Sequence, residues 1–568
     1  MEDVAARIGD TPGTVYLVDH DHQVSGRHAK ADAEIVLIPA PSDDPDDPLN
    51  WTPRRRMLAN ACMLLYVFAI CIESSVINSV IVQFSVATDI SIGDVITGNG
   101  YSYLLAGWGL LFWQPFSMQY GKRLTYLLSI AGSAAFLVWS PYVKNNGQWI
   151  ACNILGGFFN APVEALPEIT VADLYFTHER ATYMGLYAFA LVGGSCIGPM
   201  ISGFINDGLN YRWVFYVPVI FCAFVFVFLF FFAEETNYVR ARADTGATAH
   251  AAADIMKSPQ EDAKEEAKTT AAAAGEDDKM PTRGHSADVS SVEAGVVVSS
   301  SLPASSPARK TSTKTFVQKL SLLDRSRKNN VWTMFVNQIR FCSYPVVLFA
   351  GFEYGIALVW AVVTGSTASE ILGAPPYNFS ASMVGLSSVA GLLGSLVGAL
   401  FGGQITDAFT LRMVRRNGGV FEPEMRLWLF TVPMIIIPAS ILLYGVGAAH
   451  GVHWIGILIG NAALSAANTA AVPLSINYLV DTYRDMAGMA MTLVVIIRNT
   501  MYFAVSYGIQ DWIDGMGLQN AYISCAFIGM AATAVFLPMI YFGKACRQRS
   551  APAYQAMVDD AMRRGMVH

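Results

Sequence analysis

Twelve long apolar stretches constrain this chain more than any other feature of its sequence. A helix needs about 20 mostly apolar residues to cross a hydrocarbon core of roughly 30 Å, and each stretch is long enough. Six precede a long polar insert and six follow it. We therefore predict an all-α membrane protein of two six-helix halves, a layout typical of carriers built from two repeats. The predicted spans are 57–80, 95–117, 124–143, 150–172, 183–205, 213–233, 341–364, 381–403, 427–447, 452–473, 487–510 and 520–542.

Composition agrees with a membrane protein and excludes several other classes. Hydrophobic residues make up 53% of the chain and charged residues 14%, against roughly 25% charged in a soluble domain. No stretch combines clustered basic residues with aromatics, so we expect no nucleic-acid partner. The eight cysteines show no metal-ligand spacing, so we expect packing roles and neither metal, cofactor nor disulfide. No nucleophile–base pair or phosphate loop indicates an enzyme.

Positive charge predicts the orientation. Arg54-Arg55-Arg56 stand directly before the first span, and most other Lys and Arg near the spans occupy alternate loops. Because cytoplasmic loops carry this excess, we expect both termini and the insert in the cytoplasm. The start of the chain lacks the basic end and apolar core of a cleavable signal peptide. The predicted divisions are a disordered tail (1–53), a first half (54–235), a disordered linker (236–330), a second half (331–545) and a C-terminal tail (546–568).

The insert is polar and nearly free of aromatic residues, so it cannot bury enough apolar surface to fold alone. The stretch 316–340 at its end mixes apolar and basic residues. We expect this stretch to form a helix on the inner membrane face.

Two inner loops carry the first family resemblance. Gly121-Lys122-Arg123 resembles the loop signature of the major facilitator superfamily, although Met118 stands at the usual aspartate position. After the eighth span, the run Arg-Arg-Asn-Gly-Gly…Glu-Pro-Glu…Arg-Leu is similar to fungal drug:proton antiporter-type facilitators. The resemblance implies an inner gate held by salt bridges, and simple anchoring of the loop is a compatible alternative. The predicted gate residues are Lys122, Arg123, Asp173, Asp407, Arg415 and Arg416.

The fifth span carries regularly spaced small residues. Small residues four apart let helices approach closely, and a proline bends the helix. The pattern resembles the antiporter signature of drug-exporting facilitators, with Ser202 in place of one glycine; tight packing alone is the alternative. The residues of this pattern are Gly185, Gly194, Gly198, Pro199 and Gly203.

The fourth span ends in Ala-Pro-x-Glu-Ala-Leu-Pro-Glu, followed by His-Glu-Arg. This run resembles a fungal branch that includes histidinol and polyamine permeases. Asn153 stands where drug exporters of the superfamily often carry an arginine, so that arginine's role in proton coupling does not transfer.

Charged residues inside the spans predict the site, because each costs about 2.5–3.5 kcal/mol or more at mid-membrane. The spans contain four acids but only one base, so some of the acids are expected to be neutral, paired or occupied by a cation. Glu164 could alternatively form a purely structural pair with Arg498. At 100° per residue, Asn160, Glu164 and Glu168 fall on one helical stripe. The resemblance implies that spans one, four, seven and ten line a central cavity. The predicted substrate and proton residues are Glu73, Asn160, Glu164, Glu168, Glu353, Asn461, Asn468 and Arg498.

These features predict a monomeric secondary transporter whose partners are lipid, protons and a small-molecule substrate. We expect proton-coupled export of organic cationic or amphipathic compounds from the plasma membrane. The alternative is uptake of organic cations such as polyamines; a membrane sensor is a third class. Asn378-Phe379-Ser380 is an acceptor pattern for N-glycosylation on the predicted outer side.

Overall fold

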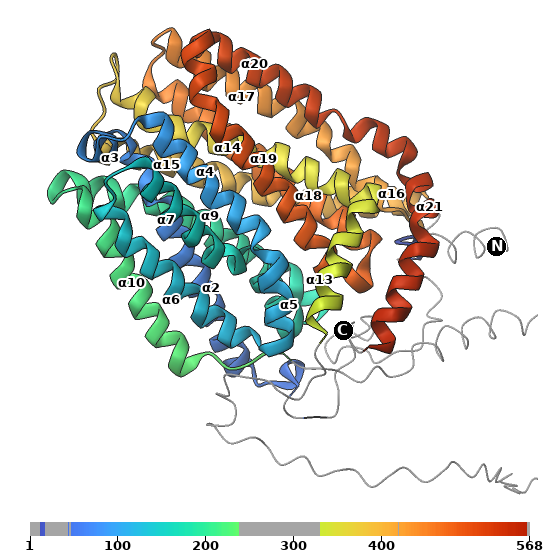
Figure 1. The fold of residues 1–568 in the computed structure, drawn as a ribbon. Coiled ribbons are helices and arrows are strands. Elements are labelled where there is room, and N and C mark those ends of the chain that lie inside the picture. The colour runs from blue at the N-terminus through green and yellow to red at the C-terminus, as the bar shows by residue number, and fades with distance from the viewer. Residues whose placement is uncertain (1–11, 17–43, 45–46, 238–329, 418–419, 565–568) are drawn as a thin grey trace, which may run out of the picture. The chain divides into compact units, whose positions relative to one another are not determined.

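The computed structural model describes residues 12–16, 44, 47–237, 330–417 and 420–564 (Figure 1). The predicted insert and most of the N-terminal tail lie outside these residues. The described chain is almost entirely helical, as the apolar stretches predicted.

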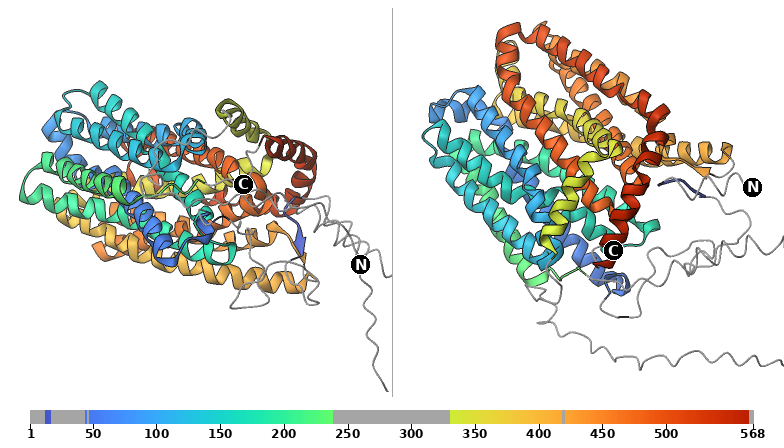
Figure 2. Two further views of the ribbon diagram at one scale, coloured as in Figure 1. Left: turned by 90° about the horizontal axis from the view of Figure 1, so that it is seen from below. Right: turned by 45° about the vertical axis from the view of Figure 1, so that its right-hand side comes forward.

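The first half is built from helices that follow one another through short connections (Figures 1 and 2). Its elements are η1 (Pro48–Asn50), α2 (Pro53–Ser75), η2 (Val76–Ser79), α3 (Ile81–Thr88), α4 (Ile92–Trp108), α5 (Leu110–Tyr120), α6 (Lys122–Trp139), η3 (Ser140–Tyr142), α7 (Asn146–Asn160), η4 (Ala161–Glu164), α8 (Leu166–Leu174), α9 (Thr177–Gly208) and α10 (Tyr211–Phe232).

The second half repeats this plan with longer helices. Its elements are α13 (Val331–Arg340), η5 (Phe341–Ser343), α14 (Pro345–Gly373), α15 (Ala381–Leu400), the π-helical turn η6 (Phe401–Ile405), α16 (Thr406–Arg416), η7 (Pro423–Phe430), α17 (Thr431–Ala449), α18 (Trp454–Thr482), η8 (Arg484–Met486), α19 (Ala487–Met516), α20 (Leu518–Thr533) and α21 (Phe536–Arg563).

Ten helical segments among the described residues are long and apolar enough to cross a membrane. The other two predicted spans are interrupted. Gly109 separates α4 from α5, and η4 separates α7 from α8, with Pro162 and Pro167 at the first turns of η4 and α8. Proline lacks a backbone N–H and disrupts the preceding turn, which explains the break in the fourth span. The ten continuous segments and these two broken ones account for the predicted twelve.

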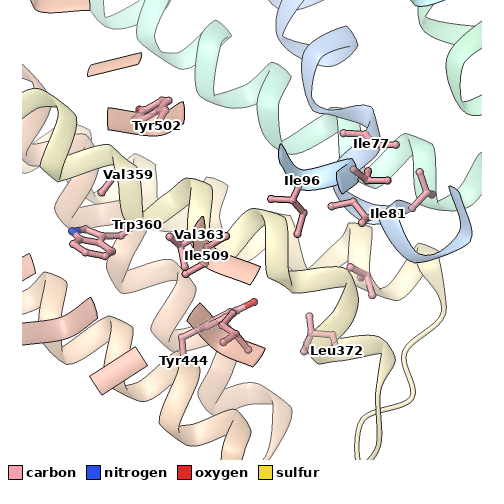
Figure 3. Packing of buried hydrophobic residues seen from close by; sticks show 14 of the residues in the cluster. Ile77, Ile81, Ile96, Val359, Trp360, Val363, Leu372, Tyr444, Tyr502 and Ile509 are labelled. Atoms are coloured by element: carbon pink, nitrogen blue, oxygen red, sulfur yellow. The ribbon is translucent and has the colours of Figure 1, made fainter. Parts of the chain in front are cut away.

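The two halves contact each other through α4 with α19 and α9 with α15. At the second contact the backbones touch: a Cβ on Gly203 would overlap the carbonyl of Ala381, and one on Gly385 would overlap the carbonyl of Pro199. A cluster of buried apolar side chains from both halves, including Ile77, Ile96 and Val363, fills the predicted outer end (Figure 3). These contacts close the predicted outer side.

The N-terminal tail departs from the prediction. Residues 1–53 were expected to be disordered, yet β1 (Val15–Tyr16) pairs antiparallel with β2 (Val420–Phe421). The reason is a buried polar contact: Arg547 Nη1 donates to the carbonyl of Pro12 at 2.6 Å and to Thr14 Oγ1 at 3.1 Å. The C-terminal tail continues α21 to Arg563, because Tyr554, Met557 and Val558 pack into the core of the second half.

Only the end of the helix predicted over 316–340 lies within the described residues. It is α13, whose Met334 is buried against the second-half core. The helix also packs on α5 and α19.

Candidate transport site

Arg498 is the centre of a polar cluster where the two halves meet. It lies in the middle of α19 and is 4% exposed. Its Nη2 contacts Glu164 Oε1 of η4 at 2.5 Å, across the interface. Its Nε and Nη2 also donate to Asn499 Oδ1 at 3.0 and 2.8 Å. The pair that the sequence offered as an alternative is therefore present, and it links the halves.

Three tyrosines surround this ion pair. Arg498 Nη1 donates to the Tyr354 hydroxyl at 2.7 Å, and the guanidinium lies 4.8 Å from the Tyr354 ring centre. It also lies 5.4 Å from the ring of Tyr502. Tyr103 of α4 packs edge-on against Tyr502 at 5.5 Å between ring centroids. Aromatic faces attract cations, so the same walls that hold Arg498 can also contact a cationic or flat organic solute.

Glu168 adds a second carboxylate to the cluster. It lies one turn beyond Glu164 on α8, and both Glu164 and Arg498 influence it electrostatically. Among the described residues it forms no ion pair or hydrogen bond. The cluster thus holds two acids and one base, so a proton or a cationic ligand is needed to balance its charge.

Glu73 and Glu353, the other two predicted acids, form no ion pair with Arg498 in the described structure. Glu73 is buried within the first half, beside Ser133 of α6 and Asn160 of α7. Glu353 is 0% exposed on α14, and neither carboxylate oxygen has a hydrogen-bond partner among the described residues. The physical reason is helical geometry: successive side chains point about 100° apart, so Tyr354 reaches Arg498 while Glu353 turns toward Phe536.

The predicted amides are divided in the same way. Asn160 ends α7 and lies with Glu73 rather than with Glu164. On α18, Asn468 is buried near the carbonyl of Ala357 of α14, and Asn461 lies near Gly391 of α15. The α18 stripe therefore faces α14 and α15 within the second half, and none of these amides contacts Arg498 in the described structure.

The inner loop of the first half is tied together as the sequence predicted. Lys122 and Arg123 begin α6 and are both buried, and Lys122 Nζ pairs with Asp173. Sequence reasoning missed Glu235, which accepts the backbone N–H groups of Lys122 and Arg123 at 3.1 Å each. Burial raises the pKa of the Glu235 carboxyl, although these backbone donors oppose the shift. The available signal was the acidic pair that directly follows the sixth span.

In the inner loop of the second half the predicted Asp407 forms an ion pair, but with Arg426 rather than with Arg415 or Arg416. Arg426 is the central base: its Nε pairs with Asp481 at 3.0 Å and its Nη1 with Asp407 at 3.4 Å. Arg415 and Arg416 are exposed on α16 and pair with no acid among the described residues. They lie on the last turn of α16, whereas Asp407 lies on its first turn, so they are too far along the helix to pair with it.

The fifth-span glycines divide into packed and unpacked positions. A Cβ on Gly194 would lie 2.6 Å from Cys71 Cβ, and one on Gly198 would overlap Ser75, both on α2. Gly203 meets Ala381 across the half interface, one turn after Pro199. Gly185 has nothing within 4 Å of a Cβ. The predicted pattern thus mixes two packing contacts within the half, one between halves, and one free position.

Asn378 of the acceptor pattern is exposed at the predicted outer side, in the loop before α15. Ser380 of the pattern also begins α15 as its N-cap, accepting the N–H of Met383. Glycosylation stays a prediction.

Comparison with known proteins identifies the family. Protein HOL1 of Saccharomyces cerevisiae is 27% identical, over 94% of this chain and 95% of that protein. MFS antiporter QDR3 of Candida albicans is 24% identical, over 89% and 80%. The xylose transporter XylE from E. coli, solved in a partially occluded inward-open conformation, shares the fold with a TM-score of 0.54 at 12% identity, over 85% of this chain and 98% of that one. The sequence model of the Major Facilitator Superfamily matches residues 63–506, so this membrane transporter belongs to that superfamily.

Proposed function

We propose that this protein is a proton-coupled exporter of small organic cations or cationic amphipathic compounds. The observation that carries the proposal is the cluster of Glu164, Glu168 and Arg498 under three tyrosines, where the halves meet. Two acids and one base leave an uncompensated negative charge when all are ionised. An uncompensated charge inside a membrane is costly, so the site favours a proton or a cation.

The exchange follows from this charge count. A cation that displaces the proton from Glu168 leaves the total charge of the cluster unchanged. The tyrosine rings supply contacts that suit a flat or alkylated cation better than a hydrated metal ion. Arg498 keeps Glu164 in place in either state. In this scheme Glu164 and Arg498 are positioning residues and Glu168 exchanges the proton.

We place the protein near the fungal drug:proton antiporter group, with the twelve spans in the plasma membrane and both termini in the cytoplasm. The inner-loop runs and the fifth-span glycines support this placement, as does the name of the similar antiporter from Candida albicans. The inner salt bridges lie within each half, Lys122 with Asp173 in the first and Arg426 with Asp481 and Asp407 in the second. In this scheme they brace the inner loop of each half.

Inverted plasma-membrane vesicles test the proposal. With an acidic lumen, they should accumulate radiolabelled tetraphenylphosphonium, and collapse of the gradient with a protonophore should stop accumulation. Glu168→Gln should abolish the response to the gradient while Glu353→Gln, whose side chain lies outside the cluster, keeps it. Accumulation that ignores the gradient in the wild-type protein would refute proton coupling.

The alternative is proton-driven uptake of organic cations such as polyamines. The observation that favours it is that Glu164 and Glu168, the two acids of the histidinol and polyamine permease-like run, are the ones that meet in the cluster. Whole cells expressing the protein should then accumulate labelled spermidine at acidic external pH, whereas an exporter should lower spermidine retention.

A further inference from the structure

The predicted inner end of the second half carries a groove that the transport site does not use. It has a volume of about 430 Å³ and lies between α16 and the η7–α17 junction. Its walls are formed by Phe409, Arg412, Met413 and Arg416 on one side and Trp428 and Thr431 on the other.

Within the described part of the chain, the two arginines of the groove have no protein partner. Arg412 and Arg416 are four residues apart, so they lie on one face of α16. Both are exposed, and neither forms an ion pair or hydrogen bond with any described residue. The nearby acid Asp407 is already held by Arg426. As far as the chain is described, the groove therefore presents two unpaired guanidinium groups, and guanidinium binds phosphate through paired hydrogen bonds.

The surroundings place the groove at the edge of the hydrocarbon. The helices that form the two walls also carry exposed apolar side chains, as lipid contact requires. These are Val397, Leu400 and Ile405 before α16, and Ile435 on α17. The segment from Ala381 to Arg416 has 36 residues, about 54 Å at 1.5 Å per residue, so it exceeds a hydrocarbon core of roughly 30 Å. The last turns of α16 therefore extend beyond the hydrocarbon core. Headgroup depth is marked by the facing wall, where Trp428, 43% exposed at the start of the ninth predicted span, is a typical interface residue.

We propose that this groove binds an anionic phospholipid of the cytoplasmic leaflet. The phosphate lies between Arg412 and Arg416, and the glycerol and first acyl carbons contact Phe409, Met413 and Trp428. The cytoplasmic leaflet carries the anionic lipids, and basic pockets on that side of membrane helices suit their headgroups. The site begins one turn from Asp407, so a bound lipid would adjoin the Arg426 salt bridges. The inference rests on the predicted orientation but not on which compound is carried.

Native mass spectrometry of the full-length protein in detergent tests this proposal. The purified protein is titrated with phosphatidylinositol and with phosphatidylcholine of the same acyl chains. The wild-type protein should retain phosphatidylinositol preferentially. Each arginine near the surface contributes about a fivefold change in affinity, so Arg412→Gln with Arg416→Gln should weaken binding about 25-fold.

Arg415→Gln is the matched control, because Arg415 is exposed on the same helix but does not line the groove. It should change the affinity less than twofold, and all variants should keep the wild-type melting temperature. Equal loss in Arg415→Gln would indicate diffuse attraction and overturn the site. Equal retention of phosphatidylcholine would do the same. Competition by inorganic phosphate or glycerophosphoinositol at the lipid's own concentration would show a site for free phosphate instead of lipid.

Discussion

At the scale of single residues, the sequence revealed which charges are buried but not which of them meet. Glu353 and Tyr354 are neighbours in the chain, yet only Tyr354 reaches Arg498. The stripe predicted through Asn160, Glu164 and Glu168 assumed one continuous helix. The break at η4 divides it, so Asn160 lies with Glu73 while the two glutamates face Arg498. The sequence shows that acids outnumber bases inside the spans. Which of these acids lie near Arg498 depends on the three-dimensional packing of the helices.

Removing Arg498 should destabilise the protein strongly. Arg498→Ala leaves the Glu164 carboxylate, 17% exposed, without its partner, and breaking a largely buried pair costs up to about 3–5 kcal/mol of unfolding free energy. Adding Glu164→Gln should restore part of that loss, because the uncompensated charge is gone. Denaturant unfolding in micelles measures both. Arg415→Ala is the control, and a loss of under about 1 kcal/mol in Arg498→Ala would show that the pair is not a buried one.

At the scale of elements, the fifth span was predictable as a helix with close approaches, but its partners were not. Glycine spacing alone cannot separate Gly203, which touches the other half, from Gly185, which touches nothing within 4 Å. The same limit applies to the inner loops. Lys122 and Asp173 were both among the predicted gate residues and do pair, whereas Arg426 was passed over for the denser Arg415-Arg416 run.

Gly203→Ala should impair transport while Gly185→Ala should not. The added methyl on Gly203 would overlap the Ala381 carbonyl, so α9 and α15 could no longer close the predicted outer side as they do here. We expect at least a tenfold loss of transport rate, with increased labelling by an impermeant thiol reagent at a cysteine introduced at Ser382. Equal transport by the two variants would contradict the contact as a gate.

The two acids beside Arg426 should contribute unequally. Asp481 is 20% exposed and lies 3.0 Å from Arg426, whereas Asp407 is 64% exposed at 3.4 Å. An exposed ion pair contributes roughly 0–1 kcal/mol to the free energy of unfolding, and loss of one partner from a more buried pair costs more. Asp481→Asn should therefore lower the melting temperature measurably, while Asp407→Asn should leave it within error. Thermal unfolding by tryptophan fluorescence compares them, and the reverse ranking would contradict the geometry.

At the scale of the whole molecule, segments far apart in sequence meet at the inner end of the second half. The N-terminal strand β1, the η7 turn and α21 converge on Arg547, whose side chain is 0% exposed. Arg547 makes two bonds to Glu424, at 2.8 and 2.7 Å. Gly13, at φ +83°, lies against Asp481 and Thr482, a conformation and a space that suit glycine. We call this meeting of β1, η7 and α21 around Arg547 the clasp. The twelve spans could be predicted from hydropathy, but the clasp could not, because a two-residue strand in a polar tail leaves no periodic signal.

The clasp predicts a large difference between two neighbouring bases of α21. Arg547→Gln removes one partner of a buried, doubly bonded pair, so it should cost about 3–5 kcal/mol of unfolding free energy. Lys544→Gln removes a half-exposed pair with Glu422 and should cost under about 1 kcal/mol. Because Arg547 also holds Pro12 and Thr14, only its variant should release the N-terminal strand, seen as faster amide hydrogen exchange at Val15 and Tyr16. Rapid exchange at these amides already in the wild-type protein would mean that the strand does not hold the second half in solution.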